Sequence, residues 1–136
     1  MYREISAVGS IHPNMQEAIS SVEGLASDWC TKDLKDAVCL VLANFSEWFS
    51  SYGPDGYPKI DRIYAGFGDH NCVRIEFEGK NGNLVLIDVY PDFAESKEMH
   101  VMHYDSDEDV EEYLSPAYSV STYFKISDWV TGGQIR

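Results

Sequence analysis

Two hydrophobic periods divide this chain, a helical period in the first third and a strand-like period after it. From Pro13 to Trp29, apolar side chains recur every three or four residues, which predicts an amphipathic helix that begins at a proline. A second stripe of the same spacing runs from Lys32 to Ser51 and is wider, so we expect this helix to lie deeper in the core. Thr31 or Asp33 would cap its first turn, and the turn residues after Ser51 end it.

Between Lys59 and Tyr90 the period changes to two, with three strand-like runs joined by two short turns. An Asn-Gly pair marks the second turn as a hairpin. A two-residue turn would place Asp88 on the same face as Ile75, whereas a three-residue loop, Lys80–Gly82, places Ile87 opposite Ile75. The three-residue loop leaves one face of the hairpin wholly apolar, so we predict that loop, with its glycine in the left-handed region.

The first hairpin supports the same register. A loop at Asp69–Asn71 also gives an apolar front, and it places Arg62 opposite Glu78 on the back, as the second hairpin places Arg74 opposite Asp88. Opposite-charge pairs across strands contribute about 0.2–1 kcal/mol each and help to fix the register. The two helices would cover the apolar front. The back face also carries Tyr64, Leu84, Leu86 and Tyr90, and it is either covered by another part of the chain or exposed.

The last third of the chain contains three further predicted elements. Glu98–Tyr104 reads as a fourth strand. In Asp105–Leu114, Ser106 precedes three acidic residues, a pattern typical of a helix start, and Pro116 would end that short helix. Ala117–Ile126 alternates between apolar and polar residues, which predicts a fifth strand. After it, Trp129 and Val130 should dock on the core.

These elements predict an α+β fold with two N-terminal helices packed on one face of a four- to five-stranded, mainly antiparallel sheet. The length of 136 residues suits one domain with a sizeable core. Neither repeats nor a linker divide the sequence, so we expect a single α+β domain over residues 1–136.

Charge is the strongest global signal, because 23 Asp and Glu residues stand against 10 Lys and Arg residues, a net charge of -13 at pH 7. Such a surface repels phosphate backbones and anionic lipids, so we expect neither direct nucleic-acid binding nor membrane binding. It attracts a basic protein partner. The sequence shows no apolar run of ~20 residues and no secretory signal pattern at its start, so the expected location is cytoplasmic.

The cysteines and histidines do not form a metal-binding pattern. Cys30, Cys39 and Cys72 are odd in number and widely spaced, which favours free thiols over a disulfide framework or a zinc site. His100 and His103 would point to opposite faces of a strand and could not share a metal ion. We therefore expect no metal and no cofactor.

The acidic segment Asp105–Glu112 begins as D-x-D-x-D, like a calcium-binding loop. The match then fails, because Val110 occupies the position that requires glycine and Pro116 the position that requires a bidentate glutamate. Two interpretations stay open: a solvated helix start, and a negative patch that docks arginine and lysine side chains of a partner.

Catalytic motifs are also missing from the sequence. The acid, imidazole and thiol within Asp69–Cys72 lie in or beside a hairpin loop, where thiol catalysis has no pocket, so a turn is the predicted role. Neither a glycine-rich phosphate loop nor a G-x-S-x-G motif is present. We therefore do not expect an enzyme.

The leading hypothesis is a small acidic inhibitor that occupies the basic site of a nucleic-acid-handling protein, such as an immunity protein against a nuclease toxin. The alternatives are a phage-encoded inhibitor of a host defence complex, of anti-CRISPR or anti-restriction type, and a small enzyme or homodimeric structural protein without a motif. The chain could be a monomer or a homodimer. The candidate partner-binding residues are Asp105, Asp107, Glu108, Asp109, Glu111, Glu112, Tyr64, Glu76, Leu84, Leu86 and Tyr90.

Overall fold

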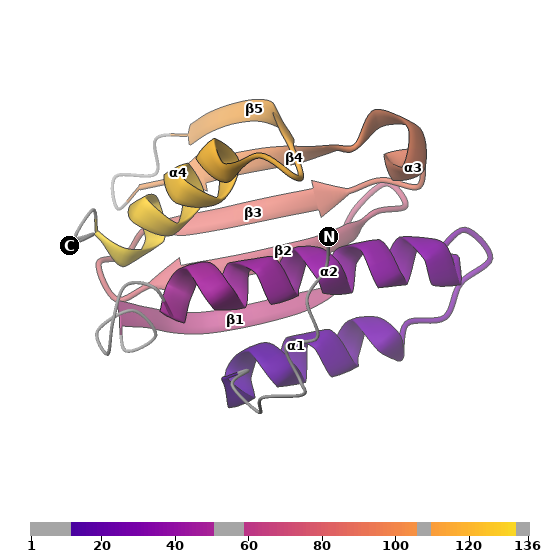
Figure 1. The fold of residues 1–136 in the computed structure, drawn as a ribbon, viewed down its shortest axis with the longest axis horizontal. Coiled ribbons are helices and arrows are strands. Elements are labelled where there is room, and N and C mark those ends of the chain that lie inside the picture. The colour runs from indigo at the N-terminus through magenta and orange to yellow at the C-terminus, as the bar shows by residue number, and fades with distance from the viewer. Residues whose placement is uncertain (1–11, 51–58, 106–109, 133–136) are drawn as a thin grey trace.

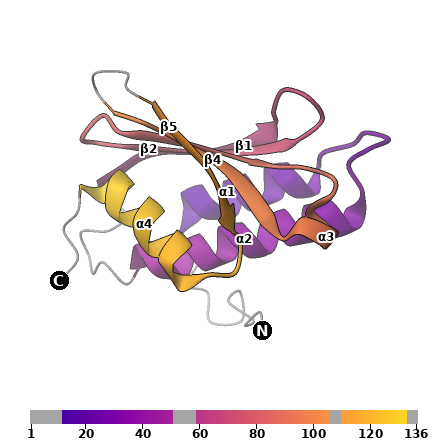
Figure 2. The same cartoon turned by 90° about the horizontal axis from the view of Figure 1, so that it is seen from above.

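A computed structural model describes residues 12–50, 59–105 and 110–132. Five antiparallel strands form one sheet in the order β1-β2-β3-β4-β5, so each strand lies beside its neighbour in the chain. The strands are β1 (Ile60–Phe67), β2 (Val73–Gly79), β3 (Leu84–Val89), β4 (Glu98–Tyr104) and β5 (Val110–Pro116), and the helices are α1 (Pro13–Glu23), α2 (Lys32–Ser50), α3 (Phe93–Ser96) and α4 (Val120–Thr131). Helices α1, α2 and α4 lie on the same side of the sheet (Figures 1 and 2), which confirms the predicted α+β architecture.

Helix α1 has a histidine cap. The ring Nδ1 of His12 accepts a hydrogen bond from the backbone N–H of Asn14 at 3.2 Å, a role that the sequence analysis missed. The helix ends at Glu23 and not at the predicted Trp29. Gly24, which follows, is a poor helix former and costs about 1 kcal/mol relative to alanine inside a helix, so the chain leaves the helix there.

Helix α2 begins as predicted, and its first turn supplies a hydrogen-bond donor to the carbonyls at the C-terminal end of α1. The Thr31 hydroxyl accepts a hydrogen bond from the backbone N–H of Leu34 at 3.2 Å, so Thr31 is the cap. From the first turn of α2, the Lys35 ammonium donates to the carbonyls of Leu25 at 2.9 Å and Glu23 at 3.4 Å. A cation at the C-terminal carbonyls of a helix also complements the helix dipole.

The sheet register agrees with the prediction in both hairpins. Ile75 lies opposite Ile87 in β3 and opposite Ala65 in β1. Gly82 adopts a φ of 89°, the left-handed conformation that the three-residue loop requires. The predicted charge pairs also stand opposite each other, Arg62 with Glu78 and Arg74 with Asp88.

The core lies between the front of the sheet and the helices. The rings of Phe45 and Phe49 from α2 meet the Phe77 ring of β2 at centroid distances of 4.9 and 5.1 Å. Tyr123 of α4 meets Phe45 at 4.7 Å. Such edge-on aromatic contacts add about 0.5–1.5 kcal/mol per pair beyond the burial of their surface.

The predicted helix after Asp105 is wrong, because residues 110–116 form strand β5. Val110, Tyr113 and Leu114 fit one face of a short helix, but the segment is also compatible with a period of two. Pairing with β4 in a continuous register from Glu98↔Pro116 to Tyr104↔Val110 satisfies the backbone and decides between the two. Of the predicted helix start, residues 106–109 lie outside the described residues.

The predicted fifth strand at Ala117–Ile126 is also wrong, because residues 120–131 form helix α4. Its buried residues recur at helical spacing, and Tyr123, Ile126 and Val130 pack into the core beside α2. The alternation of apolar and polar residues was real, but tertiary packing of the helical stripe overrides it. The predicted docking of Trp129 and Val130 is confirmed, since Val130 is fully buried and Trp129 is half-buried against the core.

Candidate functional site

The back of the five-stranded sheet is a candidate binding surface. All three long helices pack on the front (Figure 2), and none of the described helices covers the back. Residues that alternate with the core positions point to this face. They are Arg62, Tyr64, Arg74, Glu76, Glu78, Leu84, Leu86, Asp88, Glu98, His100, Met102, Tyr104, Val110, Glu112 and Leu114, and we call this set the back face.

Aromatic and aliphatic side chains occupy much of the back face. Tyr64 at the β1 edge is exposed, and Leu84 and Leu86 in the middle are half-buried. At the other edge, Val110 is 51% exposed and Leu114 is 65% exposed. The candidate residues Tyr64, Leu84 and Leu86 therefore do lie on one surface, and Tyr90 follows directly after β3 at its end.

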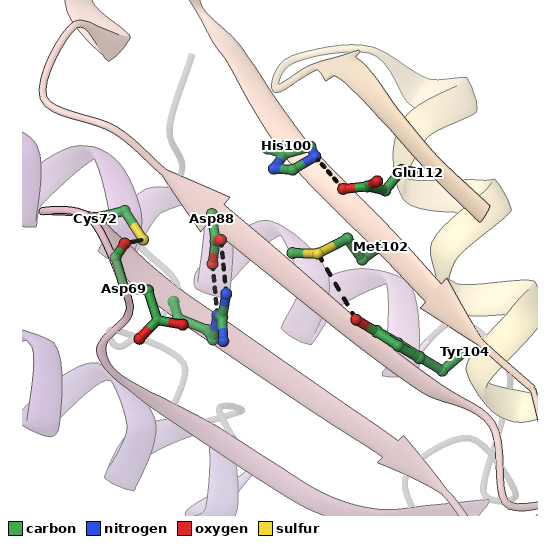
Figure 3. Close-up of polar contacts among 8 residues, drawn as sticks. Asp69, Cys72, Asp88, His100, Met102, Tyr104 and Glu112 are labelled. Atoms are coloured by element: carbon green, nitrogen blue, oxygen red, sulfur yellow. Dashed lines mark hydrogen bonds and ion pairs between the residues drawn. The ribbon is translucent and has the colours of Figure 1, made fainter. Parts of the chain in front are cut away.

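Arg74 and Asp88 form an ion pair on the back face, and Figure 3 labels Asp88 at one end of it. The guanidinium donates two hydrogen bonds to the carboxylate, at 2.7 and 2.9 Å. These bonds raise the pKa of Arg74, and the Asp88 carboxylate is almost fully buried. A carboxylate that is buried and accepts two hydrogen bonds from Arg74 stabilises the β2–β3 pairing and offers little surface to a partner.

Glu76, a candidate binding residue, is also engaged within the chain. Its carboxylate forms an ion pair with Arg62, which contacts Glu78 as well at 3.6 Å. Both arginines of the back face thus lie on β1 and β2, and their two positive charges offset two of the three carboxylates that they contact, Glu76, Glu78 and Asp88. The acidic character of the described back face is therefore greatest on the other side, at β4 and β5.

His100 and Glu112 join β4 to β5 on that side (Figure 3). The His100 Nε2 lies 3.0 Å from a Glu112 carboxylate oxygen. A shallow groove of about 480 Å³ runs beside them and is lined by Tyr90, Glu98 and Leu114 among others, with no lysine or arginine in its lining. Carboxylates, rings and the exposed Leu114 thus line one groove on the β4–β5 side of the back face.

The acidic segment does not form one patch in the part that is described. Glu111 points to the front, where Lys125 of α4 lies 3.4 Å away, while Glu112 points to the back. Alternation in a strand separates the two, whereas the predicted helix would have kept them closer together. Asp105 is half-buried at the end of β4, and Asp107, Glu108 and Asp109 lie outside the described residues.

His103 points to the front, so the two histidines of β4 face opposite sides as predicted. Its Nε2 lies 2.7 Å from the Tyr113 hydroxyl, and its ring lies 5.1 Å from the Trp129 ring. Burial lowers the pKa of His103 to about 4, so the ring is neutral at pH 7. Across the described residues, no group of three or more histidine, cysteine or acidic side chains could hold a metal ion.

The thiol beside the first hairpin is buried and protonated. The Cys72 Sγ donates a hydrogen bond to the Asp69 carbonyl at 3.0 Å, and burial together with the Asp88 charge raises the pKa of the thiol to about 12. His70 and Asn71 take the left-handed conformation that closes the hairpin. The Asp69–Cys72 segment is thus a turn, as predicted. Cys30, Cys39 and Cys72 are all free thiols, also as predicted.

A second hollow, of about 440 Å³, lies between α2 and the start of α4. Its lining includes Asn44, Trp48 and Tyr118, and the Asn44 amide donates to the Tyr123 hydroxyl at 3.2 Å. Burial raises the pKa of Tyr123 to about 12, so this hydroxyl keeps its proton. This hollow could not be predicted, because the segment that forms α4 reads as a strand in the sequence.

No described helix combines the length and the apolar character that a membrane crossing needs. The sequence matches no protein-family model, and comparison with curated proteins and with solved structures found no match.

Proposed function

We propose that this protein is a small acidic inhibitor that binds a basic protein through the β4–β5 side of its back face. The observation that carries the proposal is the back of the sheet, which no described helix covers. On its β4–β5 side the exposed Leu114 and the half-buried Tyr90 line grooves with Glu98 and Glu112, and no lysine or arginine is among the lining residues. Helices shield the front of the same sheet, so the apolar side chains on the back are not needed to close the core.

The chemistry of this surface fits a protein that handles nucleic acid. A cleft that binds phosphates is lined with lysine and arginine, and a chain with a net charge of -13 is steered toward such a cleft. Rings such as Tyr90 would then supply contact energy in the way that aromatic anchors do at protein interfaces. A nuclease toxin neutralised by its immunity protein is the specific case that we favour.

A binding experiment with matched variants tests the proposal. Affinity capture from the native host first provides the partner, and stopped-flow kinetics then measure its association with the purified chain. The double variant Glu98→Lys with Glu112→Lys should associate about tenfold more slowly at low salt, because two back-face carboxylates become cations. The purified partner should lose its nuclease activity when the unmodified chain is added.

The control is Glu17→Lys with Glu23→Lys, which changes the net charge equally at two exposed positions of α1. This variant should associate at nearly the rate of the unmodified chain. An equal loss in both variants would show that net charge alone steers binding, and no loss in the back-face variant would remove that face from the proposal.

A further inference from the structure

Strand β5 is an edge of the sheet, and β4 is its only strand neighbour among the described residues. The Ala117 N–H bonds to the Lys97 carbonyl at 2.9 Å, directly after the β4–β5 ladder. In an antiparallel ladder, pairs that exchange hydrogen bonds alternate with pairs that do not. Counting back from Ala117, the residues whose backbone bonds to β4 are Ser115, Tyr113 and Glu111.

The backbone groups of the alternate residues therefore point away from β4. Val110, Glu112 and Leu114 direct their N–H and C=O groups toward the open edge, while Pro116 has no N–H to offer. The side chains of the same three residues lie on the back face. The edge thus presents backbone donors and acceptors together with an apolar, acidic, apolar series of side chains.

The two edges of the sheet differ in how well they resist pairing. Strand β1 has a register shift between Ile60 and Arg62, the kind of irregularity that protects an edge. Strand β5 pairs with β4 from end to end without a shift and contains no lysine. It also exposes Leu114 at 65% and Val110 at 51%. Long, regular edges with exposed apolar residues are templates for another strand.

We propose that the β5 edge binds an extended, basic segment of a protein partner, which adds to the sheet beside β5. The inference rests on the proposed function, in that the partner is basic. Backbone hydrogen bonds supply affinity in this mode, and alternate side chains supply specificity. A lysine or arginine on the added strand would stand beside Glu112, between apolar residues next to Val110 and Leu114.

The negative charge of the chain disfavours a second copy of it as the partner that pairs with the β5 edge. In an antiparallel pair of β5 strands, acidic residues of one copy would stand near Glu111 and Glu112 of the other, and like charges across strands are destabilising. The net charge of -13 on each copy adds to this repulsion.

The probe for binding to the full chain is a peptide as long as β5, with blocked ends. It has valine, lysine and valine at the three alternate positions that would stand beside Val110, Glu112 and Leu114, and threonine between them. Fluorescence anisotropy should show binding to the unmodified chain, and Leu114→Lys should weaken it about tenfold, because an edge lysine blocks pairing. The matched control is Val120→Lys, which makes the same change at a 71% exposed position on α4 and should bind the peptide normally. No binding of the peptide, or equal loss in the two variants, overturns the proposal.

Amide hydrogen exchange gives the second readout. In the free chain, the N–H groups of Tyr113 and Ser115 should exchange slowly, and those of Glu112 and Leu114 rapidly. Adding the peptide should slow the exchange at Glu112 and Leu114, and the same peptide with N-methyl groups along its pairing edge should not. If a basic partner binds while these two amides stay unprotected, the edge inference fails and the proposed function stands. If the peptide protects these two amides but no basic partner exists, the edge inference stands and the proposed function fails.

Discussion

At the scale of single residues, two polar side chains of the sheet, Asp88 and His103, are both buried but are accommodated in different ways. Asp88 is charged, and the Arg74 guanidinium meets it with two hydrogen bonds. His103 is neutral, and its Nε2 lies 2.7 Å from the Tyr113 hydroxyl. A proton on the His103 ring would place a charge where burial disfavours it.

Because its folded pKa is about 4 and its ordinary value is 6.5, His103 should make stability depend on pH. Between these two values the unfolded chain binds a proton that the folded chain does not, so stability falls as pH is lowered from about 6.5 to about 4. One such proton gives a slope of at most about 1.4 kcal/mol per pH unit. Urea denaturation across this range measures it.

Carboxylates add their own slope in acid, so the variant His103→Gln isolates the histidine. Glutamine keeps a polar contact for the Tyr113 hydroxyl, and the pH dependence should become flatter than in the unmodified chain. His70→Asn, at an exposed position of the first hairpin loop with a φ of 59°, is the control for replacing a histidine outside the core. Identical pH curves for His103→Gln and the unmodified chain would contradict the assignment.

At the scale of elements, the β2–β3 hairpin holds the C-terminal end of α4. The side-chain amides of Asn83 and Asn81 donate to the Trp129 carbonyl at 3.0 and 3.4 Å, and the Trp129 indole donates to the Leu84 carbonyl at 3.4 Å. Carbonyls in the last turn of a helix have no partner inside the helix, so these amides supply one. The hairpin loop therefore has a second role that its turn pattern does not reveal.

Gly79 at this joint should not tolerate a side chain. A Cβ atom there would clash with the Val130 carbonyl of α4, which is backbone and cannot move alone. Gly79→Ala should lower the free energy of unfolding by about 1–3 kcal/mol, the usual cost of overpacking. Gly24→Ala is the control, because a Cβ there meets its nearest atom at an ordinary 3.6 Å and its φ is -86°.

Gly24→Ala should leave stability unchanged or raise it by up to about 1 kcal/mol through a less flexible unfolded chain. Urea denaturation compares both variants with the unmodified chain. A Gly79→Ala variant as stable as Gly24→Ala would mean that α4 does not pack on the hairpin as described.

How far the sequence predicts an element depends on whether local and tertiary signals agree. The register of β1, β2 and β3 was predictable because only one register joins an apolar face to charge pairs such as Arg74 with Asp88. In β5 and α4 the signals conflict. Val110, Tyr113 and Leu114 fit a helix face, but β4 offers them a strand partner, and the alternating residues before Ile126 also form a helical stripe.

For the candidate residues, the face on which each lies was predictable, but their side-chain contacts were not. Tyr64, Leu84 and Leu86 were placed on the back face correctly, because strand alternation fixes them. The sequence could not show that Arg62 neutralises Glu76, since the contact depends on side-chain conformations across strands. Nor could it separate Glu111 from Glu112 while that segment read as a helix.

At the scale of the whole molecule, negative charge outweighs the ion pairs that partly offset it. Most ion pairs among the described residues are exposed, such as Lys32 with Asp36 and Lys80 with Asp61, and exposed pairs contribute about 0–1 kcal/mol. The net charge of -13 acts on the whole compact chain and favours the more expanded unfolded state. Repulsion should therefore be the larger electrostatic term in stability.

Added salt should consequently stabilise the fold at pH 7. Raising NaCl from about 0.01 M to about 0.1 M shortens the screening length from about 30 to about 10 Å, which weakens repulsion between distant carboxylates. The midpoint of thermal unfolding should rise by roughly 4 °C, equivalent to about 1 kcal/mol for a chain of this size. The same salt step near the isoelectric point of about 4.4 is the control, because the net charge vanishes there and the rise should disappear. Protonation of His103 is common to both salt concentrations at each pH, so it cancels from the comparison. A midpoint that falls with salt at pH 7 would show that local ion pairs dominate, and the acidic surface would then be favourable to the fold by itself.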